Sequence, residues 1–152
     1  KLIDEAGNTS TVNVEVIIKV NDTVTSTTFK VFEDELIIKG INPKTAVSEF
    51  KKNIISEMEY QILNKKGTEI KNTDNVGTGC QIKMQNGKTY TLIVWGDLDG
   101  DGKISLTELA KISKIGVNKV TPTDLEKSAM DMNMNGKIEL SELAAIAKLQ
   151  LK

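Results

Sequence analysis

The sequence predicts an α+β protein in which a small β-sheet module with one helix is followed by an α-helical module built from two similar loop-helix repeats. Runs rich in β-branched residues are concentrated before residue 96, one helical periodicity interrupts them, and an acidic loop followed by an apolar helix occurs twice near the C-terminus. These observations divide the chain into a terminal strand at 1–22, an α+β module at 23–95 and a helical module at 96–152.

The composition of the chain narrows its classes of function. It has 20 basic and 21 acidic residues, a formal net charge of −1, so we expect neither a nucleic acid nor an anionic membrane as a partner. It has no histidine, which removes the commonest general base and most transition-metal sites. No apolar run reaches the ~20 residues of a membrane helix. We expect a non-catalytic fragment, cut or processed from a longer protein because it begins at Lys1.

The first 22 residues are predicted to form a turn and a strand. Residues 4–8 are the turn-forming cluster DEAGN, and residues 12–20, VNVEVIIKV, are rich in β-branched side chains. This opening resembles the last turn and strand of bacterial immunoglobulin-like modules. The resemblance implies either the tail of a truncated sandwich or a strand that joins the next module.

The next module is predicted to contain five strands and one helix. Pro43 and Thr45 indicate the start of the helix, and the apolar residues from Val47 to Met58 recur at three- and four-residue steps, which predicts one buried helical face. Asn86-Gly87 predicts a hairpin turn. The strands are expected near 29–32, 36–40, 59–63, 80–85 and 89–95.

Three features of this module resemble functional motifs without meeting their requirements. Gly77-Thr78-Gly79 has neither the lysine nor the third glycine of a phosphate-binding loop, so we expect a plain turn. Cys80 has no histidine to activate it and can form no internal disulfide, which favours a small buried side chain. Tyr90 and Trp95 are expected to pack near the module junction.

An acidic loop follows the last predicted strand. It begins at Asp97 and reads DLDGDGKISLTE, with carboxylates at positions 1, 3, 5 and 12 and Gly102 at position 6. Calcium takes six to eight oxygen ligands, so acidic side chains at alternate positions of one tight turn suit this cation. The carbonyl of Lys103 would supply position 7, Ser105 position 9, and Glu108 would bind with both oxygens. The spacing predicts a calcium-binding loop.

The same pattern begins again at Asp131, 34 residues later (131 minus 97), as DMNMNGKIELSE. The stretches that follow the loops, LTELAKISKI from Leu106 and LSELAAIAKL from Leu140, agree at six of ten positions. We therefore predict two bound calcium ions. Loop one is expected to bind calcium more tightly, because loop two has uncharged amides at positions 3 and 5. The predicted ligands are Asp97, Asp99, Asp101, Lys103, Ser105, Glu108, Asp131, Asn133, Asn135, Lys137, Glu139 and Glu142.

The duplicated loop and helix resemble type I dockerins, in which two loop-helix repeats, each lacking the entering helix of a full EF-hand, pack antiparallel with a short helix between them. The resemblance covers residues 97–152. Thr121-Pro122-Thr123-Asp124 predicts the start of the intervening helix, with Thr121 as its N-cap. Dockerins usually have aspartate at position 12, where this chain has Glu108 and Glu142, and glutamate preserves bidentate binding.

The resemblance implies a cohesin domain as the partner. It implies a docking module that anchors a secreted, extracellular bacterial protein in a multiprotein complex or at the cell surface, with a catalytic cargo such as a glycoside hydrolase upstream. Leucine at loop position 10, rather than the usual serine, suggests a different cohesin class. The implied partner-reading residues are Leu106, Thr107, Ser113, Lys114 and Asn118 in the first repeat and Leu140, Ser141, Ala147, Lys148 and Lys152 in the second.

Other interpretations of the repeats remain open at this point. Leu106 and Leu140 could pack internally, and the lysines could be ordinary solvated residues. An EF-hand calcium sensor would open an apolar groove, for which Met130, Met132 and Met134 are candidates. A calcium-stabilised structural module without a cohesin partner is the remaining alternative. In each case we expect folding of the helical module to depend on calcium.

Overall fold

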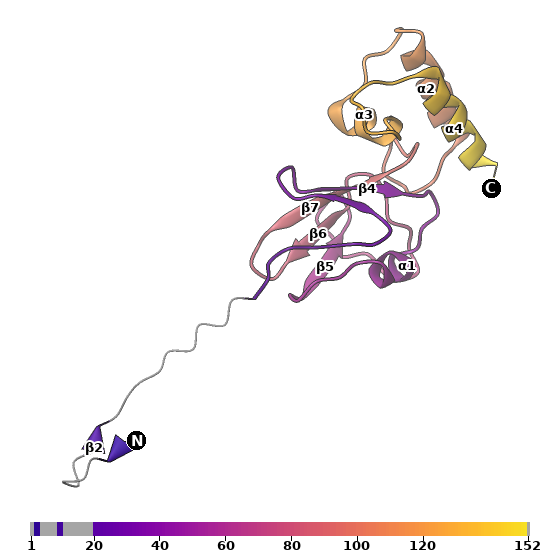
Figure 1. The fold of residues 1–152 in the computed structure, drawn as a ribbon. Coiled ribbons are helices and arrows are strands. Elements are labelled where there is room, and N and C mark those ends of the chain that lie inside the picture. The colour runs from indigo at the N-terminus through magenta and orange to yellow at the C-terminus, as the bar shows by residue number, and fades with distance from the viewer. Residues whose placement is uncertain (1, 4–8, 11–19, 152) are drawn as a thin grey trace.

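The computed structural model describes residues 2–3, 9–10 and 20–151 (Figure 1). It confirms the predicted α+β class, because a mixed five-stranded sheet is followed by helices. Two short strands, β1 (Leu2–Ile3) and β2 (Thr9–Ser10), pair antiparallel near the N-terminus. The predicted turn at 4–8, residues 12–19 of the predicted first strand, and Lys152 lie outside the described residues. Val20 is not in a strand.

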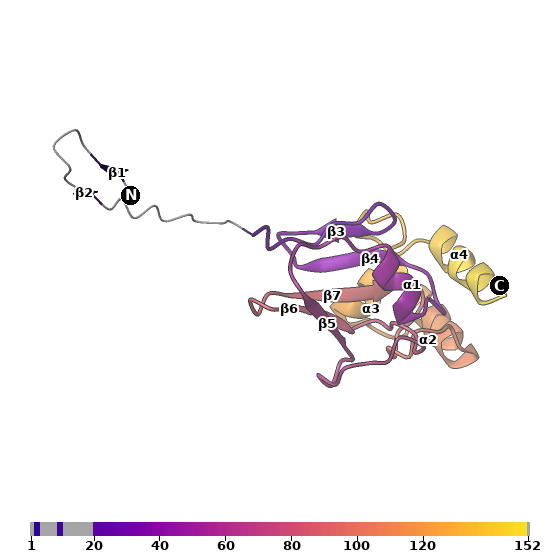
Figure 2. The ribbon, with the colours of Figure 1, turned by 90° about the horizontal axis from the view of Figure 1, so that it is seen from below.

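The sheet contains all five strands predicted for residues 23–95. Its order is β3-β4-β7-β6-β5, and the strands follow one another in this order in Figure 2. All neighbouring pairs are antiparallel except β4 and β7, which are parallel. Gly87 has a φ of 91° in the predicted turn between the last two strands. The strands are β3 (Lys30–Phe32), β4 (Ile37–Ile41), β5 (Tyr60–Leu63), β6 (Gln81–Met84) and β7 (Thr89–Val94).

The helix between β4 and β5 is shorter than the periodicity predicts. Helix α1 spans Val47–Lys52 and ends at Asn53. Ile54 still packs in the core and Met58 against it, but both do so from the following loop. The backbone of Ile55 forms two 2.9 Å hydrogen bonds with Thr25 instead of continuing the helix. The backbone bridge between Ile55 and Thr25 therefore replaces the last turns of the predicted helix. The apolar residues of those turns still pack in or against the core, as predicted.

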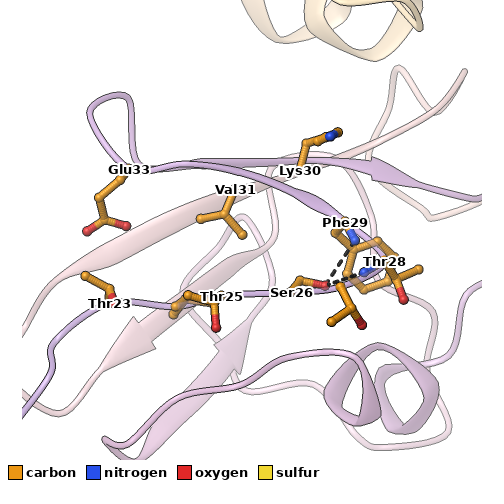
Figure 3. A pocket seen from close by; sticks show the side chains of 10 residues that line it. Thr23, Thr25, Ser26, Thr28, Phe29, Lys30, Val31 and Glu33 are labelled. Carbon is orange, nitrogen blue, oxygen red and sulfur yellow. Dashed lines mark hydrogen bonds between the residues drawn. The ribbon is translucent and has the colours of Figure 1, made fainter.

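An open groove lies between the segment that precedes β3 and β3 itself (Figure 3). Its lining is rich in hydroxyl groups, and Ser26 Oγ accepts hydrogen bonds from the backbone amides of Thr28 and Phe29. On the sheet, the buried Tyr90 hydroxyl donates to Glu33. Tyr90 thus packs inside the sheet module rather than at its junction with the helices. Cys80 is buried as expected, and burial raises the pKa of its thiol.

Three helices form the C-terminal part of the molecule and gather on one side of the sheet (Figure 1). They are α2 (Leu106–Gly116), α3 (Asp124–Met130) and α4 (Leu140–Gln150). A methyl group at Gly116, the end of α2, would lie 2.5 Å from the Leu143 side chain, so the end of α2 packs against the first turn of α4. None of the described helices is long and apolar enough to cross a membrane.

The intervening helix begins two residues later than predicted. Its N-cap is Thr123, whose hydroxyl accepts a hydrogen bond from the amide of Glu126, and the Glu126 carboxylate accepts one from the Thr123 amide. Since this capping box satisfies two free amides at the helix start, it fixes the boundary at Thr123 rather than Thr121. Ile104 and Ile138 join one apolar cluster between the helices. Ile104 and Ile138 both stand at position 8 of their loops. Within the described residues, their backbones form no β-bridge with each other.

Candidate calcium-binding site

The first acidic loop brings carboxylates together at the end of β7. Asp97, Asp99 and Glu108 each offer an oxygen, and these oxygens all lie within 4.8 Å of one another. Asp97 is fully buried and Glu108 is 4% exposed. Buried carboxylates this close repel one another unless a cation or hydrogen bonds compensate their charge. The arrangement suits a hard cation that binds carboxylate oxygens.

Asp97 lies at the centre of the hydrogen bonds that shape this loop. Its carboxylate accepts from the amides of Gly100 at 2.7 Å and Gly102 at 3.0 Å, which curls the backbone around it. Burial raises the pKa of the Asp97 carboxyl to about 6, and nearby Glu108 contributes to the rise, while the backbone amides oppose it. A divalent cation would favour the ionised form by the same electrostatics.

The second loop has the same internal geometry. Five hydrogen bonds of loop one have counterparts in loop two at the same loop positions. Donor first, they are Gly102 to Asp97 and Gly136 to Asp131; Asp101 to Asp99 and Asn135 to Asn133; Lys103 to Asp101 and Lys137 to Asn135; Asp99 to Glu108 and Asn133 to Glu142; and Ser105 to Glu108 and Glu139 to Glu142.

The remaining predicted ligands occupy the positions expected of calcium loops. The side chains of Asp101 and Asn135 are held in short turns by the amides two residues ahead. Ser105 also caps α2, since its hydroxyl accepts from the Glu108 amide at 3.2 Å. Lys103 and Lys137 have exposed side chains, which is compatible with a role for their carbonyl groups alone. The donor set consists of oxygen atoms only and fits calcium.

The described residues that the resemblance to dockerins implies for partner contact are all exposed. The two leucines at loop position 10 are the clearest case, because Leu106 is 76% and Leu140 79% exposed. The alternative that they pack internally is therefore wrong. The other described members of the set are also exposed, namely Thr107, Ser113, Lys114, Asn118, Ser141, Ala147 and Lys148.

Sequence reasoning missed two apolar residues that directly follow the same helices. Val117 is 63% exposed and Leu151 is 82% exposed. Both stand at loop position 21, so the exposed apolar residues recur in the two repeats at positions 10 and 21. Repetition of exposed leucine or valine at both positions could have identified them in the sequence.

The comparison with family models agrees with this geometry. The model described as EF hand matches residues 96–113 and 128–147, which include both loops and the first part of the helix that follows each loop. The chain carries two EF-hand-like calcium-binding motifs. No curated protein and no solved structure gives a significant match.

Proposed function

We propose that the helical module is a non-catalytic, calcium-dependent docking module that binds a cohesin-type partner. The observation that carries this proposal is the repeated exposure of Leu106 and Leu140 on helices whose start is fixed by the calcium loops. Singly exposed leucines are ordinary on a protein surface, but their recurrence at equivalent positions of two repeats favours an interaction surface over scattered residues. Two bound calcium ions would hold both helices in place for docking.

The near symmetry of the repeats supports two docking orientations. Each repeat offers leucine and a hydroxyl residue at positions 10 and 11, so a rotation that exchanges the repeats presents a similar surface to the partner. On this proposal the parent protein is secreted by a bacterium and held in a complex or at the cell surface. A cargo domain such as a glycoside hydrolase would belong to the rest of that protein.

The alternative of a calcium sensor has weaker support. Met130 is fully buried, and Met132 packs against the same cluster between the helices. These side chains therefore form part of the core rather than line a groove. A sensor would have to expose them on calcium binding. The structural-module alternative predicts calcium-dependent stability without any partner.

Binding assays against a panel of bacterial cohesin modules test the docking proposal. The full chain should bind at least one cohesin in calcium and lose it with a chelator. Leu106→Asp and Leu140→Asp together should weaken binding by about 30-fold or more, as expected for central apolar contacts. Each single variant should bind within about threefold of the native chain, because the other orientation remains. Ile55→Asp, an equally apolar exposed position on the sheet module, is the control.

The possible results separate the interpretations. If no cohesin binds in calcium while the chain remains folded, docking to cohesins is wrong and the structural-module alternative gains support. If one single leucine variant already abolishes binding, the module uses one orientation only. If calcium exposes the buried methionines, measured as increased binding of an apolar dye, the sensor alternative is favoured.

A further inference from the structure

The sheet module contacts the first calcium loop at the most buried of its ligands. The amide of Thr78 donates to Asp97 Oδ2 at 2.7 Å, in addition to the two amides of the loop itself. Thr78 is held rigidly, because its hydroxyl both accepts from the Val94 amide at 3.0 Å and donates to the Val94 carbonyl at 3.2 Å. The corresponding Asp131 accepts from Asn135 and Gly136, both within its own loop.

Two lysines of the sheet module hold the outer side of loop one. The amide of Lys44, in a left-handed conformation with φ 62°, donates to the Gly102 carbonyl at 2.7 Å. The ammonium group of Lys65 donates to the carbonyl of Asp99. These bonds bind carbonyl groups at loop positions 3 and 6, so they orient the loop backbone from outside while its carboxylates face inward.

The backbones of the 75–79 segment and of loop one approach so closely that there is no room for a side chain at Gly77, Gly100 or Gly102. A methyl group at Gly77 would lie 2.2 Å from the Gly100 oxygen, and one at Gly100 would lie 2.5 Å from the Thr78 oxygen. A methyl group at Gly102 would lie 2.4 Å from the Val76 oxygen. Gly77-Thr78-Gly79, which we expected to be a plain turn, together with residues 75–76 forms the surface on which loop one rests; we call residues 75–79 the 75–79 turn.

The second loop demonstrates that glycine at position 4 is not a requirement of the loop itself. At position 4, Gly100 and Met134 both have positive φ, 87° and 61°. Loop two thus tolerates a long side chain at a position where loop one has none. At position 6, a methyl group on Gly136 would meet no atom within 4 Å. The contact with the sheet explains the glycine at position 4 of loop one.

From these contacts we infer that the 75–79 turn, Lys44 and Lys65 form the outer layer of the first calcium site. The inference rests on calcium binding in loop one. Calcium bound there stabilises the sheet module and the helical module together, and by reciprocity the folded sheet raises the calcium affinity of loop one. The described residues show no hydrogen bond from loop two to the sheet module, so calcium in loop two acts on the sheet through the helices. Loop one is therefore the calcium-dependent joint between the modules.

Amide hydrogen exchange on the full chain tests this inference with a matched pair of variants. Glu108→Gln disables loop one and Glu142→Gln disables loop two; both glutamates stand at position 12 and are 4% exposed. Calcium should slow exchange at residues 76–80 by about tenfold or more in the native chain and in Glu142→Gln, as expected when a site gains several protected bonds. In Glu108→Gln, calcium should leave exchange at these residues unchanged.

A second variant keeps the test valid if Glu108→Gln fails to fold. Gly77→Ala should weaken calcium binding to loop one by about tenfold or more, the usual effect of disturbing the residues behind a metal ligand, and leave loop two within about twofold. Calorimetric titration in the Glu142→Gln background reports loop one alone. Lys65→Met, which keeps the chain length but removes the ammonium, should weaken the same site by a smaller factor.

The outcomes distinguish this inference from calcium binding itself. Equal protection of residues 76–80 in the two glutamine variants, or unchanged loop-one affinity in Gly77→Ala, would overturn the joint while leaving calcium binding intact. If the native chain gives no calorimetric signal on titration with calcium, both calcium binding and the proposed joint are wrong. Retained exchange protection in β6 serves as the control that the sheet is folded in every variant.

Discussion

The two calcium loops have one internal geometry and two different environments. Five hydrogen bonds recur at equivalent positions, yet Asp97 and Gly102 of loop one are buried against the sheet, whereas Gly136 of loop two is exposed. Position 4 reflects the difference, with glycine in one loop and Met134 in the other. Residues shared by the two loops therefore reflect what calcium binding requires, and the residues that differ at position 4 reflect the space left by the neighbouring module.

The two environments also give the loops different roles in stabilising the fold. Loop one has three aspartates and lies in a surface already fixed by β7 and the 75–79 turn, so both charge and rigidity favour calcium there. Loop two has one aspartate and two asparagines, and its hydrogen bonds described above come from its own repeat. Removing calcium should thus affect two levels of structure, the helices through both loops and the module joint through loop one.

Chelation should produce the largest effect. A ligand present at a thousand times its Kd stabilises the folded state by about 4 kcal/mol per site, which is comparable to the whole stability of a small helical module. We expect the helical circular dichroism signal to fall with excess chelator and to return with calcium. The sheet strands should remain folded, because their core of residues 24–94 is separate from the cluster between the helices. Unchanged helical content in chelator would contradict the proposed coupling of folding to calcium.

Alanine at loop position 6 should separate the two environments directly. Gly102→Ala and Gly136→Ala carry similar backbone strain of about 1–2 kcal/mol, because φ is 77° and 80°. Only at Gly102 does the new methyl group also meet a backbone oxygen and the Asn75 side chain. Overpacking of this kind costs about 1–3 kcal/mol more. Gly102→Ala should therefore lower the free energy of unfolding by about 2 kcal/mol more than Gly136→Ala does. Denaturant unfolding of both variants in saturating calcium measures this difference.

The Gly136 variant is itself the control for strain in the loop. If the two variants lose equal stability, the close approach of Gly102 to Val76 relaxes without cost, and the sheet is a neighbour of loop one rather than its support.

The parts of the molecule that the sequence predicted are those whose cause lies within a short stretch of chain. Each calcium loop brings its ligand positions into twelve consecutive residues, so their spacing alone predicted the two EF-hand-like motifs. The strands followed from β-branched runs in the same way. Helix α1 was predicted too long because its end depends on the backbone bridge between Ile55 and Thr25, which no local pattern indicates.

The support behind loop one was missed for the same reason. Thr78 lies 19 residues before Asp97, and Lys65 lies 34 residues before Asp99. Taken by itself, Gly77-Thr78-Gly79 is an incomplete phosphate-binding motif and predicts no more than a turn. One signal was present, since position 4 is Gly100 in one repeat and Met134 in the other. A difference between repeats at a position that binds no calcium through its side chain indicates an external contact.

Exchange of the position-5 residues should produce the smallest effect and separates charge from support. Asp101→Asn removes a carboxylate from loop one, and Asn135→Asp adds one to loop two. Each change should alter the affinity of its own loop by about tenfold, in opposite directions, because the number of charged ligands tunes calcium affinity. Calorimetric titration of the double variant measures both sites at once. If loop one remains the tighter site after this exchange, the sheet module accounts for the remaining difference. If the order of the two sites reverses, charge outweighs the support from Thr78 and Lys65, and the joint between the modules contributes less than one carboxylate to the affinity of loop one.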